Sequence, residues 1–187
     1  MLGGQGGSEI CIALTHASQN LRFAALALAQ CWDGTARKLI EAEVKAGPQD
    51  SVVQGIFVPL IDALNNLQKG DGSAAVAILE PARRYDSATL PPNAPYWILY
   101  TRGKAHLLLK EPDKAVAEFQ KILDFRGQDA TSELIPMAQL HLARAYAMQN
   151  DSVKARTAYQ DFLAIWKDAD PDIPILKEAK SEYAKLQ

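Results

Sequence analysis

The sequence is poor in cysteine, in net charge and in long apolar runs. Its 187 residues include two cysteines, Cys11 and Cys31, and the formal net charge is -2. Two cysteines do not make a disulfide framework, so we interpret them as reduced thiols of a cytoplasmic protein. A nearly neutral chain has no general attraction to nucleic acid or anionic membranes. Its strongly apolar stretches, such as residues 23–29, fall far short of the roughly 20 residues that span a bilayer.

Motifs for catalysis and cofactor binding are absent as well. The glycine-rich run at residues 3–7 follows no predicted strand and lacks the Gly-Lys-Ser/Thr ending of a phosphate-binding loop. His16, His106 and His141 are scattered, and no cysteine–histidine spacing resembles a zinc site. No nucleophile-elbow motif is present. We therefore predict a protein that is not an enzyme, without catalytic, cofactor-binding or metal-binding residues, and we interpret His106 as a packed, hydrogen-bonded core residue.

What the sequence contains is a pattern that recurs every 40 residues. Repetition at a period of about 20–50 residues is typical of stacked helical or strand units, each too small to bury its own apolar face. Small residues allow two antiparallel helices to cross at about 8–10 Å, and a larger apolar residue fills the groove toward the next pair. The recurring positions are the small residues Ala63, Gly103 and Ala143, the alanines Ala75, Ala115 and Ala155, and the larger Leu79, Phe119 and Tyr159.

This pattern predicts an all-α fold, a right-handed α-solenoid of antiparallel helix pairs. We expect residues 1–16 to be poorly ordered and not to be a signal peptide. We expect residues 17–187 to form one helical repeat domain. Its units cover about residues 17–47, 50–84, 93–126 and 131–167, and a capping helix covers 172–187. Pro59 should kink the first helix of the second unit, and Pro81 should shorten its second helix.

Each predicted turn between paired helices carries an acidic residue, namely Asp71, Glu111 and Asp151. A carboxylate at this position can accept hydrogen bonds from the amides at the start of the following helix. We therefore expect all three to cap their helices.

The pattern resembles the tetratricopeptide repeat. The residues that stand at its signature places are Gly103, His106, Ala115, Phe119 and Ile122, followed by Leu142, Ala143, Tyr146, Ala155, Tyr159 and Phe162. The chain departs from the family in its period of 40 rather than the usual 34 residues, in lacking the closing proline, and in placing Asn66 and His106 where tyrosine is common. We therefore expect an irregular superhelix.

Two segments, residues 117–127 and 159–177, resemble one bacterial group more closely. They are similar to the C-terminal repeat region of multidomain regulators that carry an N-terminal serine/threonine kinase or a winged-helix DNA-binding domain. Neither effector domain has its motifs in this sequence. The resemblance implies a signalling or interaction module without chemistry of its own. Three readings stay open: a protein-interaction scaffold, a detached regulatory module of such a kinase or regulator, and, remotely, an enzyme with an unrecognised site.

In the tetratricopeptide repeat family the residues that face a ligand come from the first helix of each pair, on the concave side. The corresponding residues are Trp97, Tyr100, Lys104 and Leu107 from the third unit, and Met137, Leu140, His141, Arg144 and Met148 from the fourth. Our hypothesis is a groove with aromatic and methionine anchors and two cations, which binds an extended or helical acidic peptide. The alternative is a set of ordinary solvated cations and packed apolar residues.

Lys104 and Arg144 occupy equivalent positions, one period apart. Replacing both by glutamate should abolish partner capture and leave the melting temperature unchanged. The family's carboxylate clamp is not predicted, because its places hold Leu60, Leu64, Thr101, Met137 and His141. Self-association is left open.

Overall fold

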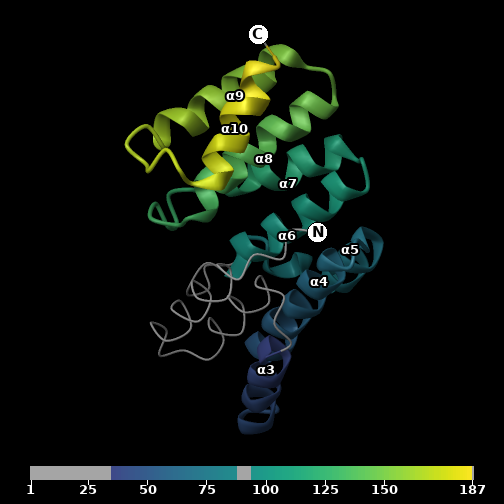
Figure 1. The fold of residues 1–187 in the computed structure, drawn as a ribbon. Coiled ribbons are helices and arrows are strands. Elements are labelled where there is room, and N and C mark those ends of the chain that lie inside the picture. The colour runs from purple at the N-terminus through teal and green to yellow at the C-terminus, as the bar shows by residue number, and fades with distance from the viewer. Residues whose placement is uncertain (1–34, 88–93, 187) are drawn as a thin grey trace. The chain divides into compact units, whose positions relative to one another are not determined.

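All regular secondary structure in the described part of the chain, residues 35–87 and 94–186, is helical (Figure 1). The all-α prediction is thereby confirmed. In this computed structural model the chain divides into two compact units, Met1–Ala88 and Thr89–Gln187, which we describe separately. The expectation of poor order at residues 1–16, Cys11 and Cys31, and the start of the first predicted repeat lie outside the described residues.

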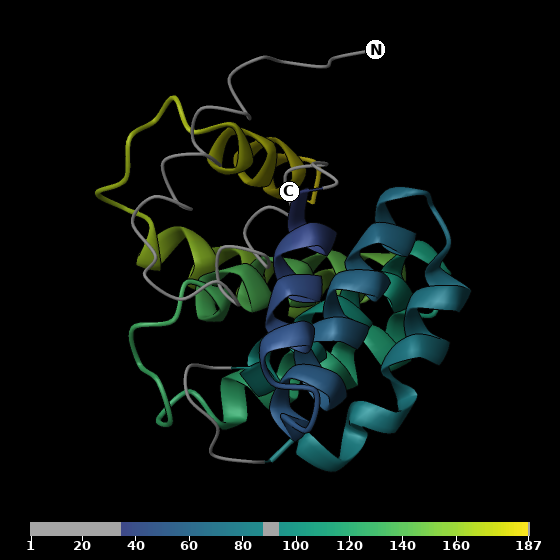
Figure 2. The same ribbon diagram turned by 90° about the horizontal axis from the view of Figure 1, so that it is seen from below.

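The helices of the first unit pack in sequential order. They are α3 (Thr35–Ala46), the π-helical turn η1 (Val53–Phe57), α4 (Val58–Gln68), α5 (Gly72–Leu79) and the 3₁₀ segment η2 (Glu80–Tyr85). Helix α4 packs against α5, and α3 lies beside η1 and α4 (Figures 1 and 2). The predicted repeat positions Ala63, Ala75 and Leu79, which lie on α4 and α5, are fully buried.

Both prolines of this unit act on the backbone, although Pro59 does so differently from the prediction. Pro59 stands in the first turn of α4, directly after the π-helical turn. A proline has no amide hydrogen and its ring clashes with the carbonyl four residues before it. A wider π-helical turn relieves that clash, so the irregularity precedes Pro59. Pro81 ends α5 at Leu79 as predicted, and the chain continues in the tighter η2.

The described part of the second unit, residues 94–186, is a succession of five helices. They are α6 (Ala94–Leu108), α7 (Pro112–Asp124), α8 (Leu134–Met148), α9 (Ser152–Ile165) and α10 (Pro174–Ala184). Each packs against the next, and α6 also contacts α8. These helices correspond to the predicted third and fourth repeat pairs and to the predicted capping helix, and their packing in sequential pairs is consistent with a tetratricopeptide-like stack.

The turn between paired helices has the same backbone geometry at 40-residue intervals. Gly70, Lys110 and Asn150 all have positive φ, at 80°, 57° and 60°. The amide of the following residue donates to the carbonyl oxygen five residues earlier. The N–O distance is 2.9 Å when Asp71 is the donor, 2.9 Å for Glu111 and 3.0 Å for Asp151. This combination is the Schellman motif, which ends a helix through one left-handed residue. The repeat is therefore present in the backbone itself.

The predicted capping role is confirmed for two of the three acidic turn residues. Asp71 accepts from the Ala74 amide at 2.8 Å, and Asp151 accepts from the Lys154 amide at 3.0 Å. Glu111 makes no such bond to α7, so that prediction is wrong. Its side chain is one methylene longer, and its carboxylate instead lies 2.8 Å from His106 Nδ1 and 2.9 Å from Lys114 Nζ.

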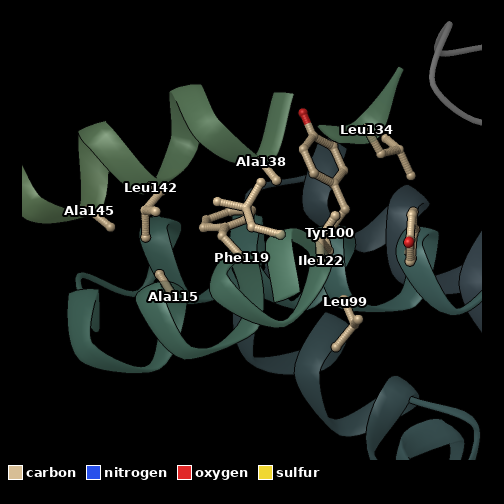
Figure 3. Close-up of a cluster of buried hydrophobic side chains, with 11 residues drawn as sticks. Leu99, Tyr100, Ala115, Phe119, Ile122, Leu134, Ala138, Leu142 and Ala145 are labelled. Atoms are coloured by element: carbon tan, nitrogen blue, oxygen red, sulfur yellow. The ribbon is translucent and has the colours of Figure 1, made fainter. Parts of the chain in front are cut away.

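The core between α6, α7 and α8 is organised around one phenylalanine. The Phe119 side chain reaches from α7 toward Ala138 and Leu142 of α8 (Figure 3). On the α6 side it lies against Gly103, where an added Cβ atom would stand 2.6 Å from two of its ring carbons. The side chain that approaches Gly103 most closely is thus that of Phe119, the larger apolar residue of the same repeat.

Candidate functional site

The nine residues predicted to face a ligand all lie on α6 and α8, but they differ in accessibility. Tyr100, Leu140 and His141 are buried. Trp97, Lys104, Leu107, Met137 and Arg144 are partly buried, and Met148 is exposed. As a binding set they remain a prediction. Their burial limits direct contact with a partner to the members that reach the surface.

The buried residues Tyr100 and His141 join α6 to α8. The Tyr100 hydroxyl lies 3.0 Å from His141 Nε2, and the two rings meet edge to face with centroids 5.4 Å apart. The Phe119 ring stacks on the imidazole, with centroids 5.4 Å apart and an interplanar angle of 17°. Two aromatic neighbours and a hydrogen bond make His141 a packing residue of the interface between the helices.

The same surroundings fix the charge of His141. Burial, followed by the positive charges of Arg144 and Lys104, lowers the pKa of His141 from 6.5 to about 3. Burial also raises the pKa of Tyr100. Both groups are therefore neutral near pH 7, and neither contributes charge to the surface above them.

Lys104 lies above this pair. Its ammonium nitrogen is 5.7 Å from the centre of the Tyr100 ring, which is a cation–π distance. Burial, and then repulsion by Arg144, lowers the pKa of Lys104. Within residues 35–87 and 94–186, no carboxylate forms an ion pair with Lys104. Among the described residues, the partly buried Lys104 cation therefore has an aromatic ring, and no carboxylate, as its partner.

Arg144, its equivalent on α8, is paired. Its guanidinium donates from Nε and one terminal nitrogen to the two carboxylate oxygens of Glu182, both at 2.9 Å. The same terminal nitrogen donates to Glu178 at 3.3 Å. Both acids belong to α10, so Arg144 bridges α8 to that helix. Burial opposes this charge, but the bonds to Glu182 raise the pKa of Arg144.

An exposed apolar side chain stands one helical turn after each of the two cations, Lys104 and Arg144. Met148 follows Arg144 by four residues and is 41% exposed, and Leu108 follows Lys104 by four residues and is 47% exposed. Sequence reasoning chose Leu107 instead, which packs partly against the core. The strict period of 40 could have identified Leu108, because it is Leu108 that lies one period before Met148. We call the set Lys104, Leu108, Arg144 and Met148 the α6–α8 face.

The described part of the chain offers neither a metal site nor a membrane-spanning helix. No group of three or more histidine, cysteine, aspartate or glutamate side chains there could hold a metal ion. Nor does any helix among those residues reach the length and apolarity that crossing a bilayer requires. His106 is 3% exposed and paired with Glu111, which confirms its interpretation as a hydrogen-bonded core residue.

Comparison with known families bears on the C-terminal part of this face. Residues 137–169 match the tetratricopeptide repeat family. The matched segment contains most of α8 and all of α9, and therefore Arg144 and Met148. The chain thus carries a tetratricopeptide repeat within an all-helical protein. No curated protein and no solved structure matches it.

The tetratricopeptide match suggests interaction with other proteins, since helical repeats of this kind present extended surfaces on which partners bind. Such repeats are usually non-catalytic, and no catalytic family was found. The match concerns the repeat alone and shows no link to kinases or to transcriptional regulators.

Proposed function

We propose that this chain is a non-catalytic, cytoplasmic protein-interaction module, and that its α6–α8 face binds a peptide segment with carboxylate side chains. The observation that carries the proposal is the state of Lys104. This cation is partly buried, it lies beside a second cation, and no described carboxylate pairs with it.

Burial of a charge is unfavourable unless the charge is paired. For Lys104 the cost shows as a lowered pKa, and the ring of Tyr100 offsets only part of it. A carboxylate supplied by a partner would offset the rest and would also reduce the repulsion between Lys104 and Arg144. A charge-assisted hydrogen bond contributes about 1.5–3 kcal/mol. The face is therefore complementary to an anion.

The neighbouring side chains favour a peptide over a small anion. Leu108 and Met148 are exposed one turn beyond the two cations, and Trp97 and Met137 are partly accessible two turns before them. Methionine and tryptophan are common at interfaces, where one adapts its shape and the other supplies a large rigid surface. Alternating cations and apolar side chains fit a segment that presents acids beside apolar residues.

The test is selection of binding peptides from a random displayed library with the purified full-length chain. We expect enrichment of sequences that combine Asp or Glu with large apolar residues. The Lys104→Glu variant should bind the selected peptides at least about tenfold more weakly, because 1.4 kcal/mol corresponds to a factor of ten. The control is Lys69→Glu, which makes the same charge change at an exposed position of the first unit.

Lys104 should be changed alone in this experiment. Arg144 is bound to Glu178 and Glu182, so Arg144→Glu would place three acids together and loosen α10. The double substitution considered in the sequence analysis would therefore lower the melting temperature instead of leaving it unchanged. Selected peptides without acidic residues, or equal binding by Lys104→Glu and Lys69→Glu, would refute the proposal.

A second, regulatory function is favoured by one observation. Segments 117–127 and 159–177 resemble the repeat region of bacterial multidomain kinases and winged-helix regulators. We propose accordingly that the module serves bacterial signalling. The genomic sequence upstream tests this point, because this regulatory function requires an in-frame kinase or DNA-binding domain there.

A further inference from the structure

We propose that the surface beneath α10 is a binding site for an amphipathic helix with two carboxylates one turn apart, and that α10 is its resident, exchangeable ligand. The proposal rests on the proposed function, since a partner of the α6–α8 face would compete with α10 for Arg144. It concerns a surface that shares Arg144 with that face but is formed by α8 and α9 and includes Tyr159.

The polar half of this site is a receptor for one carboxylate. Glu182 accepts two hydrogen bonds from Arg144 and a third from the Tyr159 hydroxyl, all at 2.9 Å. Burial and the nearby Glu182 raise the pKa of Tyr159, so the phenol keeps the proton that it donates. A fork-shaped guanidinium together with a hydroxyl matches the geometry of a carboxylate.

The apolar half of the site is small. Helix α10 buries two side chains, Leu176 and Ala179, against a cluster that includes Tyr159 and Phe162. By contrast, α7 buries five residues and α8 seven. At a few kcal/mol per fully buried large side chain, α10 is the least firmly held helix of its unit. Weakly packed elements open locally at a lower free energy than the whole domain.

The same contacts define the ligand. Glu178 and Glu182 are four residues apart, so both reach Arg144 from one side of a helix. Leu176, Ala179 and Tyr183 are spaced by three and four residues and form the adjacent apolar stripe. A partner helix with this arrangement could replace α10. The net charge of α10 itself is not acidic, because the exposed Lys177 and Lys180 balance Glu178 and Glu182.

Exchange would change the α6–α8 face as well. With α10 in place Arg144 is occupied, and of the two matched cations Lys104 alone can receive a partner's carboxylate. With α10 displaced both cations become available, together with the apolar residues on which it lay. Binding of an external helix is thus opposed by α10, and its apparent affinity is the intrinsic affinity multiplied by the fraction of chains in which α10 is undocked.

The experiment uses the full-length chain and, as probe, a fluorescent peptide of residues 172–186. Wild-type chain should bind this probe weakly, because its own α10 competes at high effective concentration. Glu178→Gln/Glu182→Gln in the chain should tighten binding of the unchanged probe about tenfold, since a tenfold weaker internal contact exposes tenfold more free site. Leu176→Ser, which loosens α10 without touching its acids, should act in the same direction.

Two controls make the result specific. Lys180→Gln alters an exposed residue of α10 that is not on the side of the two glutamates, and it should leave probe binding unchanged. A probe in which both glutamates are glutamine should bind the loosened chains at least about tenfold more weakly. Equal affinity for wild type and loosened variants, or no binding by any of them, would overturn the proposal.

The outcome is separable from that of the proposed function. Lys104→Glu tests the α6–α8 face and leaves the contacts of Glu182 in place. If library peptides bind in a Lys104-dependent manner and the α10 probe does not bind, the exchange is wrong and the proposed function stands. If the probe behaves as expected and no library peptide depends on Lys104, the reverse holds.

Discussion

Replacing Gly103 by alanine tests the packing on which the second unit depends. A Cβ atom at this position would lie 2.6 Å from both Cε1 and Cζ of Phe119 and 3.0 Å from Cδ1. Such separations do not occur between a real Cβ and a neighbouring carbon. The obstacle is a rigid ring with no exposed surface, so it cannot swing into solvent. Either the ring or the spacing between α6 and α7 has to change.

The magnitude follows from two opposed effects. Forcing an extra carbon into a packed core costs about 1–3 kcal/mol. Alanine in a helix is favoured over glycine by about 0.8–1 kcal/mol, which offsets part of that cost. Because three ring atoms are approached and the ring is itself stacked on His141, the upper part of the range applies. We expect Gly103→Ala to destabilise the chain by about 1–2 kcal/mol.

The assay is urea denaturation followed by circular dichroism, with wild type and Gly103→Ala compared at constant slope. Gly127→Ala is the matched control, because a Cβ there meets nothing within 4 Å. The double variant Gly103→Ala/Phe119→Leu should be more stable than the sum of the single changes, since the smaller side chain removes the clash. A Gly103→Ala variant as stable as wild type would refute the close approach of α6 and α7.

Two further predictions concern stability. Folding keeps His141 neutral down to about pH 3, so between that pH and 6.5 the unfolded chain alone gains this proton. The free energy of unfolding should therefore fall by about 2 kcal/mol between pH 7 and pH 5. In urea titrations His141→Gln should remove that part of the pH dependence. Lys110→Gly should raise the urea midpoint by an amount equivalent to about 0.5–1 kcal/mol, because Lys110 has a φ of 57° where the equivalent Gly70 is unstrained; an unchanged or lower midpoint would contradict this.

The helix pairs and their order could be predicted because small residues and turn residues recur with a period of 40. Both kinds of signal are local and depend on backbone geometry. The Schellman turn at Lys110 escaped prediction, since lysine is not a residue that favours positive φ. The positive φ of Lys110 follows from its position in the repeat. This becomes evident only when the repeats are aligned, because Gly70 and Asn150 then occupy the equivalent position.

The candidate site was less predictable, because its properties depend on contacts between helices. Sequence position placed Tyr100 and His141 on a ligand-facing side, but the 3.0 Å contact between them and the ring of Phe119 bury both. The buried ion pair between Arg102 and Glu118, at 2.8 Å, joins α6 to α7 and had no signal in the sequence. The occupation of Arg144 by α10 likewise depends on where a later helix packs.

Core packing and the proposed binding face are linked through one chain of contacts. The small residue at 103 lets the ring of Phe119 approach α6, and that ring stacks on His141. His141 is bonded to Tyr100, and the Tyr100 ring lies under the ammonium group of Lys104. A displaced Phe119 ring would therefore move the support on which Lys104 rests. Gly103→Ala should weaken peptide binding beyond its effect on the folded fraction, whereas a control of equal instability in the first unit should not.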